Sequence, residues 1–116
     1  FCARHQDDPQ LAAFTTVLAD MSTKWVGLTT SLAARAQANA EEVGAAAVDY
    51  LYYSGYLTLA YLWARSVAAA ESGGQAAAFR KAKRDTARFY FTRILPRCLG
   101  HQAAIEAGVD SLPDID

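Results

Sequence analysis

One long stretch of the sequence is almost free of charge, and it constrains the fold more than any other feature. From Val43 to Ala64 the only charged residue is Asp49. A helix that is apolar around its whole circumference is either buried within protein or inserted in a membrane. The stretch is rich in alanine and tyrosine rather than leucine and isoleucine, and it also contains Ser54 and Thr58. We therefore expect a buried helix and no membrane span.

The rest of the chain also favours helix. Alanine is abundant, and the 116 residues include only three prolines and seven glycines. Since proline and glycine disfavour a helix interior most strongly, their scarcity indicates an all-α fold. A composition of 53% hydrophobic and 20% charged residues is typical of a folded domain rather than a disordered tail. A chain of this length suits one domain with one core.

Turn and cap residues divide the chain into helices. Asp8 and Pro9 are typical of a helix start, and an apolar stripe at three- and four-residue steps then continues to about Ala38. The stripe consists of Leu11, Phe14, Leu18, Met21, Trp25, Leu28 and Leu32. Asn39 predicts a break before a second helix, which should extend to about Ser72.

A third helix is expected to begin at Gln75, after a turn at Gly73-Gly74. Its apolar side is predicted to consist of Phe79, Ala82, Thr86, Phe89, Tyr90 and Ile94. Pro96 should kink or restart the helix, and Gly108 should end it. The pattern thus predicts an antiparallel bundle of three long helices plus a short Pro-kinked C-terminal helix.

The beginning of the chain predicts where the domain lies. The first residue is not Met, and the following residues lack the apolar stretch of a secretory signal. We therefore expect residues 1–8 to be a linker from a missing upstream region and residues 9–116 to form a helical C-terminal domain. Cys2 and Cys98 show no metal-ligand spacing. They suggest reduced thiols in a cytoplasmic protein, with a disulfide between them as the alternative.

Few residues occur in patterns typical of a catalytic or metal-binding site. His5 lies in the expected linker, and His101 has no second histidine or carboxylate four residues later, so the pattern does not predict a metal site. No nucleophile–base or acid–base pair is recognisable, so no catalytic residues are assigned and an independent helical enzyme is disfavoured. A net charge of −1 and the absence of a base-reading motif disfavour nucleic-acid binding.

Two groups of side chains are candidates for contact with a partner. The second helix has more aromatic residues than a small core can cover, so we expect another domain or subunit to pack on it. The candidate interface residues are Tyr52, Tyr53, Tyr56 and Trp63. A basic stripe on the third helix, within an arc of about 100°, consists of Arg80, Lys81, Arg84 and Arg88. Arginine suits the phosphates of coenzyme A or acidic residues of a subunit, and a solvated helix face is the alternative.

The second and third helices resemble a known family. Two aromatic segments are followed in order by three shorter ones: Tyr50-Leu51-Tyr52-Tyr53-Ser54-Gly55-Tyr56, Ala60-Tyr61-Leu62-Trp63-Ala64, Lys83, Ala87-Arg88-Phe89-Tyr90 and Ile94-Leu95-Pro96. This order is similar to that in the C-terminal domain appended to one subgroup of acyl-CoA dehydrogenases. The resemblance extends from about Leu11 to Leu112.

The resemblance implies a larger parent protein. Such a parent holds FAD and oxidises an acyl-CoA to the 2,3-enoyl-CoA, with a catalytic glutamate that lies upstream of the appended domain. No glutamate of this chain matches it, so the resemblance implies an accessory and assembly domain that binds no cofactor alone. Its partners would be the catalytic domains of the same chain, in a homo-oligomer. The alternative is a freestanding helical interaction or dimerisation module without catalysis.

Overall fold

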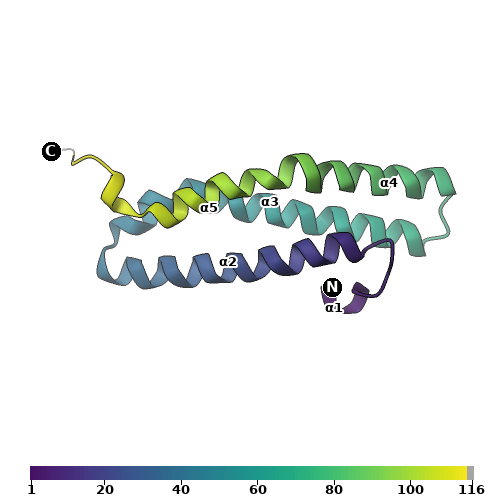
Figure 1. The fold of residues 1–116 in the computed structure, drawn as a ribbon, viewed down its shortest axis with the longest axis horizontal. Helices are drawn as coiled ribbons and strands as arrows, with labels where there is room; N and C mark the ends of the chain where they lie inside the picture. The colour runs from purple at the N-terminus through teal and green to yellow at the C-terminus, as the bar shows by residue number, and fades with distance from the viewer. Residues whose placement is uncertain (115–116) are drawn as a thin grey trace.

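The computed structural model describes residues 1–114, and these residues form an all-helical bundle, which confirms the expected fold class. The α-helices are α1 (Cys2–His5), α2 (Ala12–Ala38), α3 (Glu41–Ser72), α4 (Ala77–Phe89) and α5 (Cys98–Ala107). The shorter turns are a π-helical segment, η1 (Tyr90–Ile94), and two 3-10 segments, η2 (Leu95–Arg97) and η3 (Val109–Ser111). The molecule is elongated, 62 × 24 × 16 Å. Its three long units are α2, α3 and the continuous segment from α4 to α5, and each is antiparallel to the one before it (Figure 1).

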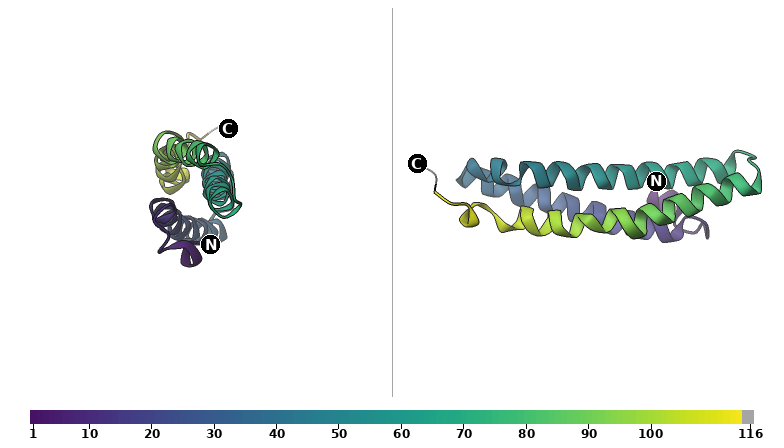
Figure 2. Two further views of the ribbon diagram at one scale, coloured as in Figure 1. Left: turned by 90° about the vertical axis from the view of Figure 1, so that its right-hand side faces the viewer. Right: turned by 90° about the horizontal axis from the view of Figure 1, so that it is seen from above.

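Helix α3 is the centre of the bundle, because α2 and the α4–α5 segment both pack along its inner side (Figure 2). Its inner face is lined mainly by small buried residues: Ala46, Ala60, Ala64, Val67 and Ala70. Small side chains allow neighbouring helices to approach closely, and the close-packed contacts supply dispersion energy. The nearly uncharged stretch of the sequence is therefore the segment on which the other helices pack.

Helix α2 confirms the predicted apolar stripe. Phe14, Leu18 and Leu28 are buried, and the remaining stripe residues within the helix, Met21, Trp25 and Leu32, pack against the core. The predicted helix start was wrong by three residues. Asp8 does not cap the helix, because its Oδ1 accepts a hydrogen bond from the N–H of Gln10 at 2.8 Å and holds a turn before Ala12.

The first residues are more ordered than a linker would be. They form α1, and the ring of Phe1 packs edge-to-face on Tyr61 of α3, with the ring centres 5.6 Å apart. Phe1 and Cys2 both pack against the core. The segment expected to be a linker therefore contributes to the folded bundle.

The predicted irregularity at Pro96 takes the form of a local change of helix type. Helix α4 passes through η1 and η2 into α5 as one rod (Figure 1). Pro96 has no N–H to donate to the carbonyl of Thr92, four residues earlier, and its ring crowds that carbonyl. A π-helical turn followed by a 3-10 turn accommodates this misfit without ending the rod.

The predicted apolar side of the third helix was wrong for four of its six residues. Phe79 and Phe89 are exposed, as are Ala82 and Thr86, whereas Tyr90 is buried and Ile94 packs against the core. The inward side of α4 instead contains the small, fully buried Ala87. Close contact with α3 favours small residues on this side of α4, and long basic side chains lie at the edges of the contact. The large rings of Phe79 and Phe89 therefore face outward.

A single arginine connects three helices at one end of the bundle. Arg35 of α2 donates from Nη2 to the carbonyl of Ile105 in α5 at 2.9 Å, and its Nη1 lies 3.3 Å from Oε2 of Glu42 in α3. The last carbonyls of a helix have no donor within it, so this bond satisfies an otherwise unpaired group. Gly108 then ends α5, as predicted, with φ 70° and ψ −167°, a conformation that essentially only glycine adopts.

We predict opposite effects for two glycine-to-alanine substitutions. Gly108→Ala should lower the free energy of unfolding by about 1–3 kcal/mol, because of its backbone conformation and because an added Cβ would lie 3.2 Å from Nη1 of Arg35. Gly100→Ala, inside α5 with open space around the added Cβ, should raise it by about 0.5–1 kcal/mol. Urea denaturation followed by circular dichroism measures both. A stabilising Gly108→Ala would contradict the described helix end.

We predict that Arg35→Met lowers the free energy of unfolding by about 2 kcal/mol, since it leaves Glu42 and the Ile105 carbonyl without a partner. Lys24→Met is the matched control, because Lys24 pairs with Asp20 on the exposed side of one helix. Such exposed pairs contribute about 0.5 kcal/mol or less. Equal effects of the two substitutions in urea denaturation would show that Arg35 does not connect the helices.

Candidate functional site

The outer side of α3 carries a continuous apolar surface, which we call the α3 stripe. Its members are Val48, Leu51, Tyr52, Leu59 and Leu62, with exposed fractions between 46% and 69%. Steps of three and four residues place them along one side of the helix, with Gly55 between them. Large contiguous apolar patches on proteins in water mark contact sites for other molecules. The α3 stripe is therefore the first candidate for a functional surface.

The exposure of this stripe follows from the position of α3 in the bundle. The sequence predicts a helix covered on all sides, but α2 and the α4–α5 rod cover only its inner side. No helix within residues 1–114 is both long and apolar enough to cross a membrane. The bundle thus leaves one apolar side of its central helix without a covering element among the described residues.

Three of the four aromatic residues predicted at an interface reach the surface. Tyr52 is 51% exposed and stacks on the ring of His101 in α5, with 5.2 Å between the ring centres and 9° between the planes. Tyr56 is half-buried and continues this stack. Trp63 is half-buried, with Nζ of Lys83 5.9 Å from the centre of its ring.

The fourth residue, Tyr53, is a correction to the prediction. It is 1% exposed, and its hydroxyl donates to the carbonyl of Met21 at 3.4 Å, so it belongs to the core between α3 and α2. Burial raises the pKa of its phenol to about 12. Adjacent residues of a helix point about 100° apart, which explains why Tyr52 faces outward and Tyr53 inward.

A pair of polar side chains joins α3 to α5 beside the stripe. Nδ1 of His101 lies 2.8 Å from Oδ1 of Asp49, and both side chains are partly buried. The pair explains how the one charge of the apolar stretch is accommodated. The residues within one turn of His101 offer it no partner, because Asp49 lies on another helix and 52 positions away in the sequence.

Two of the four residues of the predicted basic stripe form ion pairs with acidic neighbours. Arg84 forms an ion pair with Glu71 at the end of α3, and Lys81 pairs with Asp85 one turn along α4. The hydrogen bond from Lys81 lowers the pKa of the Asp85 carboxyl. Among residues 1–114, Arg80 and Arg88 have no acidic partner. Arg88 also lines a hollow of about 290 Å³ with Arg84 and Phe14.

The reactive side chains inside the bundle have a packing role. Both cysteines are free thiols, and burial raises the pKa of Cys98 to about 11. Burial also raises the pKa of Tyr90 to about 12, and its hydroxyl donates to the carbonyl of Tyr56 at 2.8 Å. A thiol with so high a pKa stays protonated near neutral pH and is a poor nucleophile. The described residues contain no group of three or more metal-ligating side chains.

Comparison with known proteins identifies the family. A family model described as "Acetyl-CoA dehydrogenase C-terminal like" matches residues 1–116, which include the aromatic segments of α3 and the whole α4–α5 rod. No curated protein and no solved structure matches the chain. The family match confirms the resemblance found in the sequence. The chain therefore belongs to the family of acetyl-CoA dehydrogenase C-terminal-like domains.

Proposed function

We propose that this chain is the accessory and assembly domain of a larger FAD-dependent acyl-CoA dehydrogenase, in which it packs on the catalytic domains through the α3 stripe. The observation that carries the proposal is the exposed apolar side of α3 in a domain of this family. The parent would oxidise an acyl-CoA to the 2,3-enoyl-CoA and form a homo-oligomer in the cytoplasm.

The α3 stripe has the properties of a docking surface rather than of a flexible surface. Its backbone belongs to the helix on which α2 and the α4–α5 rod pack, so the stripe is held rigidly from behind. At its edge, the stacked rings of Tyr52 and His101 and the pair of His101 with Asp49 fix an aromatic group in place. Rigid aromatic and aliphatic anchors lose little entropy when a partner covers them, which favours a stable interface.

The domain is proposed to support the flavin enzyme rather than to hold the flavin. A hollow of about 550 Å³ lies between α1, α2 and α3 and includes Leu18, Trp25 and Leu57 in its lining. No charged side chain lines it, whereas a dinucleotide cofactor needs donors for its pyrophosphate. The residues of this hollow therefore do not fit FAD, and we assign the cofactor to the catalytic domains, as the family resemblance implies.

The basic residues left without a partner give a second, smaller contact. Arg80 and Arg88 are the members of the basic stripe that have no ion pair among residues 1–114. We propose that they contact acidic groups of a neighbouring subunit or the phosphates of coenzyme A. Arg84 and Lys81 contribute less to such a contact because an acidic neighbour already neutralises each of them.

We predict that Leu59→Asp in the protein purified from its complete reading frame disrupts assembly and lowers flavin content. A buried, unpaired carboxylate in an interface costs about 3–5 kcal/mol, which corresponds to at least a hundredfold weaker docking. Size-exclusion chromatography with light scattering measures assembly, and the ratio of visible flavin absorbance to protein absorbance measures flavin content. Leu59 is 47% exposed in this domain, so the substitution should leave the fold of the bundle intact.

Val26→Asp is the matched control, because Val26 is 57% exposed on α2 and lies outside the α3 stripe. It should leave assembly and flavin content unchanged. Normal assembly and flavin content in Leu59→Asp would refute the docking surface. A well-folded wild-type protein without flavin would refute the enzyme class, and the same stripe would then mark a freestanding dimerisation module.

A further inference from the structure

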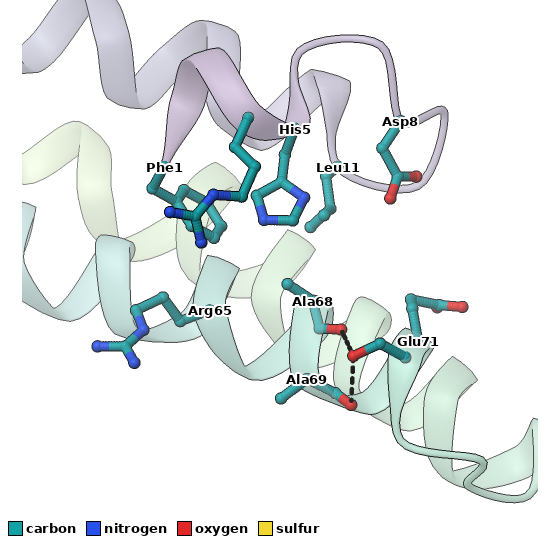
Figure 3. Close-up of a pocket in the computed structure, with 10 residues that line it drawn as sticks. Phe1, His5, Asp8, Leu11, Arg65, Ala68, Ala69 and Glu71 are labelled. Atoms are coloured by element: carbon teal, nitrogen blue, oxygen red, sulfur yellow. Dashed lines mark hydrogen bonds between the residues drawn. The ribbon is translucent and has the colours of Figure 1, made fainter.

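Three basic side chains from two helices line one hollow at the N-terminal end of the chain. The hollow has a volume of about 450 Å³ and is lined by Arg4 and His5 of α1 and by Arg65 of α3. Figure 3 shows His5 on the α1 side and Arg65 on the α3 side, with Leu11 and Ala68 also at the hollow. The volume lies within the usual range of small-molecule sites, about 300–1,000 Å³.

The charge around this hollow is slightly positive when Arg84 is counted. Asp8 and Glu71 line it together with Arg4 and Arg65, and Glu71 is paired with Arg84, so three guanidinium groups stand against two carboxylates, a net charge of +1. No ion pair within residues 1–114 includes Arg4 or Arg65. A concave site with unpaired arginines concentrates a positive potential and attracts anions.

Aromatic contacts hold two of the three basic side chains, Arg65 and His5, in position. The guanidinium carbon of Arg65 lies 5.6 Å from the ring centre of Tyr61, Tyr61 packs edge-to-face on Phe1, and Phe1 lies 4.6 Å from the ring centre of His5. A guanidinium that stacks on a ring still presents its N–H edge to a ligand. This chain of contacts therefore orders donors on both sides of the hollow before any ligand is bound.

Apart from Ser72, the remaining lining is apolar. Its accessible part is the ring of Phe1 with Ala68 and Ala69, whereas Leu11 is buried, with 1% of its surface exposed. A bare inorganic anion would leave these groups unused, whereas an anion attached to a compact ring or apolar group would cover them. The combination points to a ligand with a phosphate at one end and a ring at the other.

We propose that the hollow between α1 and α3 binds a small phosphate ester, with its phosphate held by Arg4 and Arg65 and its ring resting on Phe1, Ala68 and Ala69. Arginine binds phosphate oxygens through two parallel N–H donors, and a nearby histidine adds a further donor. The proposal does not depend on the enzyme class proposed above, because none of its residues lies in the α3 stripe.

Equilibrium dialysis of the protein from its complete reading frame tests the proposal, with AMP as the probe and adenosine as the same molecule without phosphate. AMP should bind at least tenfold more tightly than adenosine. Arg65→Gln and Arg4→Gln should each weaken AMP binding about tenfold, since each removes charge-assisted hydrogen bonds to the phosphate, and neither should change adenosine binding.

Arg97→Gln is the matched control, because Arg97 is an exposed arginine of η2 that does not line the hollow. It should leave AMP binding unchanged, and circular dichroism should show equal helix content in all variants. Unchanged AMP binding in both Arg4→Gln and Arg65→Gln would overturn the proposal. So would AMP binding that is no tighter than adenosine binding, or an equal loss in Arg97→Gln, which would show a general charge effect.

Discussion

The close contact of α3 with the helices on its inner side is the interaction on which the rest of this domain depends. The inner face is built largely from alanines, and Ala60 and Ala64 are completely buried. Small residues let α2 and the α4–α5 rod lie close to the same helix, and this shared contact forms one core. Because α3 is apolar on its outer side as well, the same helix that organises the domain also presents a surface to a partner.

The contacts at the ends of the rods complete this arrangement. At one end, Arg35 connects α2 and α3 to the last turn of α5, and Gly108 allows the chain to leave the helix beside it. In the other half of the bundle, α1 folds back so that Phe1 contacts Tyr61. The π-helical turn before Pro96 keeps α4 and α5 in one rod. An elongated domain with fixed ends is suited to hold a long docking surface straight.

Much of the fold could be predicted from local patterns. The bounds of α3, the apolar side of α2 and the glycine that ends α5 all follow from short-range signals such as spacing, caps and breakers. The apolar side of α4 could not be predicted in this way. Phe79 and Phe89 are regularly spaced but exposed, because contact with α3 favours the small Ala87 over a larger side chain.

The candidate surfaces could also be predicted only in part. An excess of aromatic residues on α3 indicated a partner surface, but periodicity did not separate the outward Tyr52 from the buried Tyr53. The pairs of Asp49 with His101 and of Glu71 with Arg84 join different helices, and only the three-dimensional arrangement brings them together. The hollow between α1 and α3 depends on a short helix that was expected to be linker.

Hydroxyl-radical footprinting of the protein from its complete reading frame is the most direct test of whether a partner covers the α3 stripe. The measurement compares the oxidation rates of Leu51 and Tyr52 with that of Val26, all three of which are more than half exposed in this domain. If a partner covers the stripe, Leu51 and Tyr52 should be oxidised several-fold more slowly than Val26 after correction for intrinsic reactivity. Equal corrected rates at the three residues would show that the stripe faces water and would contradict its coverage by a partner.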